Sequence, residues 1–162
     1  MHSEGLAGKT ETFLRYGVTP RLAVGFGYLH KQGYVRPLLS YTLTPETPKI
    51  PSTTLGLMTD SLGGGRQGAF MTFGKALPGL PASVYIGPAK ITGEPRFRLL
   101  AGINGRIGKN FSASVQLDGR YANVGLVSTV GQVSGIPLRL GIVAAHGNRF
   151  GPLAAWNIPL KP

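Results

Sequence analysis

Glycine and proline interrupt this chain about every ten residues from one end to the other. The 25 glycines and 13 prolines are spread through all 162 residues and are not gathered into one tail. Both residue types disfavour helix interiors and favour turns. Long helices therefore have little room, and the chain is expected to form short extended segments joined by hairpins.

Turn residues divide the chain into about eleven extended segments. Because the breaks are regular and the composition does not shift, we expect residues 8–160 to form a single domain after a flexible N-terminal segment at residues 1–7. The clearest breaks lie at 18–21, 31–33, 45–51, 63–68, 77–81, 92–95, 108–110, 118–119, 131–135 and 147–149.

Hydrophobic residues alternate with small or polar residues inside these segments. In residues 111–118, phenylalanine, alanine, valine and leucine alternate with serine, glutamine and aspartate. Similar alternation runs through 21–30, 96–107 and 138–145. Side chains of a β-strand point to opposite faces with a period of two, so these segments are predicted to be strands of an all-β protein.

The two faces of these strands indicate a membrane environment. Charged residues make up only 14% of the chain, against about 25% in soluble domains. The polar face carries glycine, alanine, serine and some arginine, which suits an enclosed interior better than a solvated surface. Segments of about 9–11 residues match strands that cross a bilayer at a tilt. A sheet in lipid cannot leave an open edge, so closure into a barrel is favoured.

We therefore predict an antiparallel up-and-down transmembrane β-barrel of about ten strands, with eight to twelve possible. An even strand number is usual for single-chain bacterial barrels, so we expect either residues 121–130 or residues 150–158 to be irregular, or two segments to merge. Pro37 and Pro88 lie inside apolar segments and are expected to mark bulges or strand ends. A soluble β-barrel or β-sandwich is the alternative fold.

The sidedness prediction assigns each residue of these strands to one of two environments. Bulky apolar side chains are predicted to face lipid, and arginines of the small-residue face are predicted to point into the lumen or to sit at its rim. The predicted lipid-facing residues are Leu22, Val24, Phe26, Phe97, Leu99, Ile103, Phe111, Val115, Leu117, Leu138, Leu140 and Ile142. The predicted basic lumen residues are Arg15, Arg21, Arg36, Arg96, Arg98, Arg106 and Arg139, and the predicted lumen acids are Glu11, Asp60 and Asp118.

These arginines support two interpretations of the interior. A basic lumen would favour anionic solutes, since rings of charge set the selectivity of pores. A filled lumen would instead have arginines that hydrogen-bond to polar side chains and backbone carbonyls. The second interpretation is favoured because about ten strands enclose only a narrow space. The expected side-chain partners are Asn104, Ser112, Ser114 and Gln116.

Catalytic and metal chemistry have little support in the sequence. The chain has no cysteine, and His2, His30 and His146 lack metal-ligand spacing. Ser61, Asp60 and His146 could in principle form a hydrolase site, but no sequence pattern brings them together. We expect no metal, no cofactor and no catalytic residue; a barrel-embedded lipid-modifying enzyme is a further alternative.

The net charge of +11 indicates an anionic partner. Nucleic-acid binding usually requires basic residues clustered with aromatic residues. Here the arginines are spread over nearly every segment, so we expect an anionic lipid or polysaccharide surface instead. A soluble module that binds an anionic partner is the alternative function.

Three stretches carry a resemblance to a known class. They are Leu22–Tyr28 after a Thr-Pro-Arg turn, Arg106–Phe111 and Gln116–Leu126. In style they resemble strands and hairpins of bacterial outer-membrane β-barrels, of the porin-like and exopolysaccharide-associated kind, and the resemblance covers most of residues 8–160. It implies an outer-membrane location, a structural or passive-transport role without enzymatic activity, and contact with membrane lipid or detergent, anionic solutes or lipopolysaccharide.

The N-terminus does not show the basic start and apolar stretch of an export signal. If the protein is exported, we expect a processed or partial chain. No apolar run reaches the ~20 residues of a transmembrane helix.

Overall fold

The computed structural model describes residues 11–29, 33–60, 66–133, 136–145 and 149–156. Within these ranges the chain forms eleven β-strands and no helix. The strands are β1 (Glu11–Gly17), β2 (Leu22–Leu29), β3 (Tyr34–Thr44), β4 (Ser52–Asp60), β5 (Arg66–Ala76), β6 (Ala82–Ile91), β7 (Arg98–Ile107), β8 (Phe111–Leu117), β9 (Ala122–Val133), β10 (Ile136–Ala145) and β11 (Arg149–Trp156).

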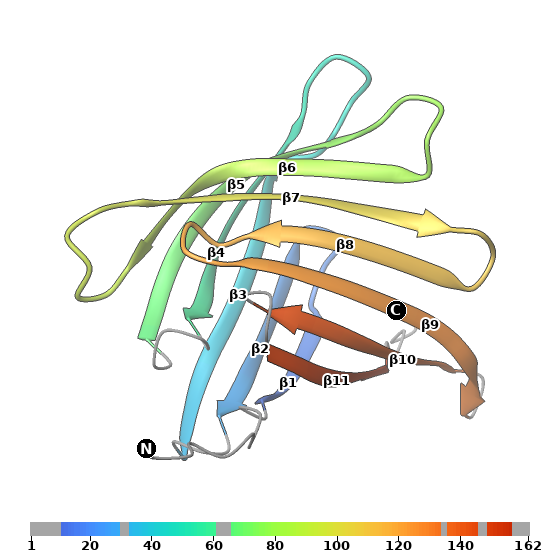
Figure 1. Ribbon diagram of the computed structural model, residues 1–162. Coiled ribbons are helices and arrows are strands. Elements are labelled where there is room, and N and C mark those ends of the chain that lie inside the picture. The colour runs from blue at the N-terminus through green and yellow to red at the C-terminus, as the bar shows by residue number, and fades with distance from the viewer. Residues whose placement is uncertain (1–10, 30–32, 61–65, 134–135, 146–148, 157–162) are drawn as a thin grey trace.

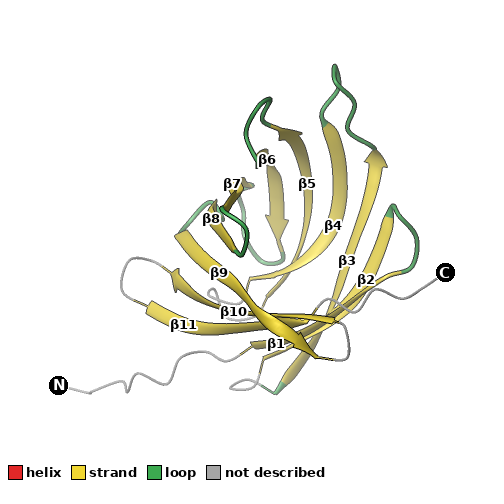
Figure 2. Ribbon diagram, turned by 90° about the vertical axis from the view of Figure 1, so that its right-hand side faces the viewer, coloured by secondary structure: helices red, strands yellow, loops and turns green. Residues whose placement is uncertain are grey.

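All eleven strands belong to one sheet in which each strand pairs with the next in the sequence. Every pair is antiparallel, which confirms the all-β, up-and-down prediction. The sheet curls strongly, and β11 comes to lie near β1 in both ribbon views (Figures 1 and 2). No ladder joins β1 to β11 among the described residues, so the sheet is open at this seam.

Eleven strands fall within the predicted range of eight to twelve. The expectation that residues 121–130 or 150–158 would be irregular is wrong for the described residues, because 122–130 belong to β9 and 150–156 to β11. Both pair along most of their length with β10. The even-number rule had suggested a missing strand, but the hairpin rhythm of the sequence continues to the end of the described chain.

The register of the ladders aligns residues of the same kind on neighbouring strands, so that they form continuous rows of side chains. Ile103 pairs with Val84 on one side and Val115 on the other, and Val115 pairs with Val124. Large apolar side chains thus stand next to one another on one face, where cross-strand neighbours interact. The adjacent row on the opposite face consists of Ser83, Asn104, Ser114 and Gly125.

Few hydrophobic side chains of the curled sheet are buried. Among the described residues only Ala89, Ile91 and Leu100 are buried hydrophobic side chains. By contrast, 26 large hydrophobic residues of the described chain are exposed. A soluble domain stabilises itself by moving most of its apolar surface into a core. This sheet has the reverse arrangement.

Aromatic rings that lie on glycines fill part of the enclosed face. Tyr85 pairs with Gly102 across β6 and β7, and Phe70 pairs with Gly56 across β4 and β5. A Cβ atom at either glycine would stand 2.6 Å from the partner ring. Each ring thus occupies the space that a side chain would need, which is a known way to pack glycine in a sheet.

Pro37 and Pro88 lie inside β3 and β6, at places where ladders are incomplete. The β5–β6 ladder pairs Phe70 with Ala89 and Phe73 with Ile86, and it skips the two positions opposite Gly87 and Pro88. Proline has no N–H to donate there. The bulges that the register does show lie elsewhere, between Thr42 and Thr44 and between Leu138 and Arg139.

At Pro37 the neighbouring strands β3 and β4 are already apart, since their ladder starts at Leu39 and Leu57. The Gln67 amide donates to the Pro37 carbonyl at 3.0 Å and to the Met58 carbonyl at 3.1 Å. One side chain from β5 thus bridges the backbones of β3 and β4 beyond the end of their ladder.

We predict that Gly87→Ala destabilises the fold by about 2 kcal/mol or more, because overpacking against backbone has no easy relief. The added Cβ would lie 1.9 Å from the Met71 backbone oxygen. The matched control is Gly131→Ala in β9, where nothing lies within 4 Å of the added atom. Urea unfolding of both variants in detergent micelles measures the difference, and equal stabilities would contradict the close approach at Gly87.

Candidate functional site

Exposed apolar side chains extend over the outer face of the described sheet. Leu22 and Val24 are partly exposed, and the side chain of Leu138 lies outside the described residues. The other nine residues predicted to face lipid are all exposed: Phe26, Phe97, Leu99, Ile103, Phe111, Val115, Leu117, Leu140 and Ile142.

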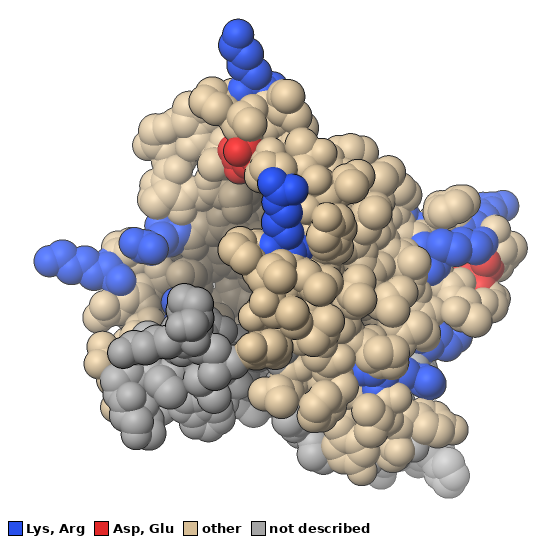
Figure 3. Space-filling model, turned by 180° about the vertical axis from the view of Figure 1, so that it is seen from behind, with Lys and Arg blue, Asp and Glu red and all other residues tan. Residues whose placement is uncertain are grey.

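Further residues extend this outer face around the sheet. Leu14 and Tyr16 belong to β1, and Ile86 belongs to β6. The exposed side chains therefore run from β1 to β10. Lys and Arg project mainly from the margins of the face seen in Figure 3, and most of the surface between them is uncharged. Other members are Leu39, Tyr41, Leu55, Phe73, Val124 and Leu126.

The arginines predicted for the lumen occupy several environments. Arg98 is 5% exposed and lies on the enclosed face, where its ladder partner is Ala89. Arg36 is partly exposed, and its guanidinium lies 5.0 Å from the centre of the Tyr34 ring. Arg21, Arg96, Arg106 and Arg139 are exposed, Arg21 in the β1–β2 turn and Arg96 in the β6–β7 loop, and the side chain of Arg15 lies outside the described residues.

The three acids predicted for the lumen do not include Glu94, the acid that pairs with the arginines. Asp118 stands in the β8–β9 turn, where its Oδ1 accepts from the backbone N–H groups of Arg120 and Tyr121 at 2.8 and 2.7 Å. This is a turn-forming role of aspartate. The side chains of Glu11 and Asp60 lie outside the described residues.

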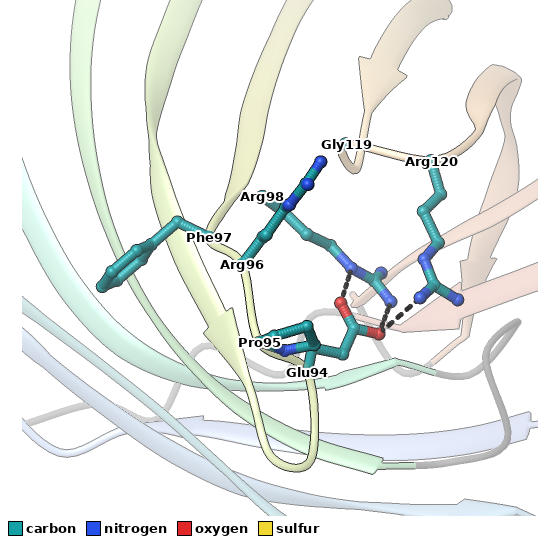
Figure 4. A pocket seen from close by; sticks show the side chains of 7 residues that line it. All are labelled: Glu94, Pro95, Arg96, Phe97, Arg98, Gly119 and Arg120. Atoms are coloured by element: carbon teal, nitrogen blue, oxygen red, sulfur yellow. Dashed lines mark hydrogen bonds and ion pairs between the residues drawn. The ribbon is translucent and has the colours of Figure 1, made fainter.

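Glu94 is the centre of the polar site. Its Oε1 accepts from Nη2 of Arg98 at 2.5 Å and of Arg66 at 2.6 Å, and Nη2 of Arg120 lies 3.0 Å away. Nε of Arg98 also donates to Oε2 at 2.8 Å, so this pair is bidentate. Figure 4 shows Arg98 and Arg120 reaching toward the carboxylate while Phe97 points away from it. We call Glu94 with these three arginines the Glu94 cluster.

Three chain segments bring the cluster together at one end of the sheet. Arg66 opens β5 and Arg98 opens β7. Glu94 lies in the β6–β7 loop after Gly93, whose φ of +79° suits glycine. Arg120 lies in the β8–β9 turn. We call this end the β6–β7 rim; it contains the loop at 92–97 and the turn at 118–121.

Gly119 allows the β8–β9 turn to approach Arg98. Its φ is +82°, and a Cβ atom there would lie 2.6 Å from Cβ of Arg98. A glycine is therefore needed both for the turn conformation and for the close contact. The approach places Arg120 within reach of Glu94.

The arginines keep Glu94 ionised. The hydrogen bond from Arg98, followed by the charges of Arg98, Arg120 and Arg66, lowers the pKa of Glu94 below its ordinary value of 4.5, and partial desolvation opposes this only in part. The side chain is 7% exposed, whereas those of Arg66 and Arg120 are 36% and 45% exposed. The anion and Arg98 are thus covered, and Arg66 and Arg120 extend to solvent.

A pocket of about 280 Å³ lies beside the cluster. Its lining joins the β6–β7 loop to the β8–β9 turn: Glu94, Pro95, Arg96, Phe97, Arg98, Gly119 and Arg120. Lys90 ties the β6–β7 loop to β6, since its Nζ donates to the backbone carbonyls of Glu94 and Pro95 at 2.6 and 3.0 Å.

Sequence reasoning missed Glu94, although a signal was present. Glu94 is one of only six acids, and arginines follow it at positions 96 and 98. An acid in a turn is a candidate partner for an arginine four residues later, which here is Arg98. The contributions of Arg66 and Arg120 had no local signal, because they depend on strand register.

Comparison with protein-family models, with curated proteins and with solved structures finds no match for this chain. In the part of the chain that the structure describes, no group of histidine and acidic residues has the arrangement of a metal site. The described ranges also contain no helix long and apolar enough to cross a membrane. Ser61, His30 and His146, and the side chain of Asp60, lie outside the described residues.

We predict that Glu94→Gln lowers the stability of the protein at neutral pH, because three guanidinium groups then lose their shared anion. A carboxyl group whose pKa is depressed by folding stabilises the fold above its unfolded pKa, and this contribution is lost as the pH falls. The advantage of the unchanged protein over the variant should therefore shrink below about pH 4.5. Urea midpoints between pH 7 and pH 3 measure it.

Glu46→Gln is the matched control. Glu46 faces Lys75 at 3.6 Å in a partly exposed pair, and ion pairs near the surface contribute little. A Glu94→Gln deficit that is the same at every pH would contradict the electrostatic role of the carboxylate.

Proposed function

We propose that this protein is a membrane-spanning β-barrel of the bacterial outer-membrane kind, with a structural or passive-transport role. The observation that carries the proposal is the inverted distribution of apolar side chains. The described residues bury three hydrophobic residues and expose 26 large ones. Soluble monomers rarely expose apolar patches larger than a few hundred Å². Acyl chains around the outer face would make this arrangement favourable.

Strand length supports the same proposal. The strands β3 to β7, β9 and β10 have 9–12 residues, whereas β1, β2, β8 and β11 have 7 or 8 within the described ranges. A tilted strand needs about 9–11 residues to cross the hydrocarbon core. The charged side chains of β7 fit this span: Arg98 begins the strand, Arg106 is next to its last residue, and the outward positions between them are apolar.

In a membrane the open seam between β1 and β11 must close, because lipid cannot satisfy unpaired backbone groups. In an up-and-down sheet, strands of odd number run in the same direction. β1 and β11 would therefore close as a parallel pair. Barrels with an odd number of strands exist in mitochondria, so closure of this kind is physically accessible.

The enclosed face suits a narrow polar interior. Tyr85 and Phe70 fill the part near β5 and β6, whereas Asn104, Ser114 and Gln116 belong to the enclosed rows further along the sheet. Oδ1 of Asn123, which pairs with Gln116 in an enclosed row, is buried without a protein hydrogen-bond partner. Buried acceptors of this kind are usually satisfied by water. The excess of arginine at the β6–β7 rim favours anions at that mouth.

We predict a depth-dependent penalty for charge on the outer face. Ile103→Arg, in the middle of β7, should cost about 2–4 kcal/mol of folding free energy in vesicles. Ile107→Arg, at the end of the same strand, should cost about 0–1 kcal/mol. Both isoleucines are exposed, at 42% and 59%, so a water-facing sheet would tolerate both changes.

Urea unfolding of the two variants in phosphatidylcholine vesicles measures the difference. On a soluble protein, exposed substitutions usually change stability by less than about 0.5 kcal/mol. Two near-neutral variants would therefore overturn the membrane assignment.

A further inference from the structure

The β6–β7 rim carries more positive charge than its carboxylates balance. Five cations meet there, and the acids nearby are Glu94, Asp118 and Asp60, which is the ladder partner of Arg66. Two positive charges remain in excess. The five cations are Arg66, Lys90, Arg96, Arg98 and Arg120.

The geometry concentrates this charge. The Nη2 atoms of Arg66, Arg98 and Arg120 all lie within 3.0 Å of one oxygen of Glu94. No two of them can therefore be more than about 6 Å apart, a distance at which like charges repel strongly when water is partly excluded. A further anion at this place would relieve the repulsion among these guanidinium groups.

The pocket beside Glu94 gives such an anion a place to bind. Arg98 forms a buried floor, Arg120 is about half exposed, and Arg96 is exposed. In Figure 4 the Arg96 side chain extends along the pocket toward Gly119, and Arg120 stands on the other side. Guanidinium groups bind phosphate oxygens with paired, charge-assisted hydrogen bonds. The donor set fits a phosphate group better than a lone halide.

The same pocket adjoins the apolar outer face. Phe97 lines it and is 71% exposed, and Leu99, the next outward residue of β7, is 57% exposed. Nζ of Lys90 lies 5.3 Å from the centre of the Phe97 ring, so a cation also stands on the apolar side. A ligand here would meet arginine at one end and hydrocarbon at the other.

We propose that this pocket binds the phosphate headgroup of an anionic membrane lipid, with Arg96 and Arg120 as ligands and the acyl chains against Phe97 and the outer face. The site rests on the proposed function, because only a membrane-inserted sheet presents Phe97 to acyl chains. A soluble phosphate compound would use the arginines but leave the apolar side without contact.

The test compares two arginine pairs in the full chain. Arg96→Gln with Arg120→Gln removes the proposed ligands. Arg21→Gln with Arg106→Gln removes the same charge from exposed positions at the opposite end of the strands. Native mass spectrometry in a non-ionic detergent, titrated with dioleoyl phosphatidic acid or dioleoyl phosphatidylcholine, gives the dissociation constant of the first bound lipid.

The unchanged protein should bind phosphatidic acid more tightly than phosphatidylcholine. The rim variant should weaken phosphatidic acid binding about tenfold or more, as expected for the loss of two charge-assisted contacts. The control pair should leave it within about twofold. Equal losses in both variants would overturn the site, because they would indicate general attraction to positive charge.

Inorganic phosphate distinguishes the two sources of the anion. If it binds the unchanged protein as tightly as phosphatidic acid does, and the rim variant abolishes this binding, the pocket is a site for soluble phosphate and the lipid assignment is overturned. Insertion is scored separately by heat-modifiable migration on gels after reconstitution into vesicles. A chain that does not insert overturns the proposed function and the lipid site together, whereas an inserted chain without a lipid preference overturns the site alone.

Discussion

The pleat of one curled, continuously hydrogen-bonded sheet is the constraint on which the rest of this structure depends. Every strand sends alternate side chains to two faces, and curvature gives these faces unequal room. The outer face can hold leucine, isoleucine and phenylalanine, whereas the enclosed face admits mainly glycine, serine and alanine with selected larger groups. A shift of one residue in any strand would exchange the two sets, so the register and the sidedness are specified together.

The large side chains on the enclosed face lie where a neighbouring residue leaves room for them. Tyr85 lies over Gly102 and Phe70 over Gly56, so each ring occupies the place of a missing side chain. Arg98 lies at the β6–β7 rim, where it pairs with Glu94 and the backbone at Gly119 packs closely against it. Buried charge is costly unless it is paired and hydrogen-bonded, and the bidentate contact meets this condition.

The same arrangement links stability to binding at the rim. The carboxylate of Glu94 organises three arginines that would otherwise repel one another, and it leaves a surplus of charge next to exposed aromatic and aliphatic side chains. The Glu94 cluster therefore stabilises the ends of the hairpins and also forms part of the proposed site for an amphipathic anion. The two roles overlap in part: the buried Arg98 pairs with Glu94 and forms the floor of the pocket, Arg120 contacts Glu94 and also lines the pocket, and the exposed Arg96 lines the pocket alone.

Much of the fold could be predicted from the sequence, because turn chemistry and period-two alternation are local. The segments, their antiparallel order and the exposure of residues such as Ile103 and Leu117 all follow from them. The strand number was less predictable, because β11 has no local feature that separates a strand from an irregular end.

The polar site could be predicted only in part. Arg98 was named from its face of β7, but its partner Glu94 was missed and Asp118 proved to be a turn residue. Arg66 and Arg120 come together only because the ladders of four hairpin-connected strands place them at the same end of the sheet. No short stretch of sequence predicts that proximity.

The central claim is that the bulky apolar face contacts acyl chains while the small-residue face does not. The chain has no cysteine, so single spin labels can be placed at the adjacent positions Ile103 and Asn104 of β7. Collision rates with oxygen and with a water-soluble nickel complex in reconstituted vesicles then report the two environments. We predict high oxygen and low nickel accessibility at position 103, with the opposite trend at position 104. Free access of nickel to position 103 would contradict it.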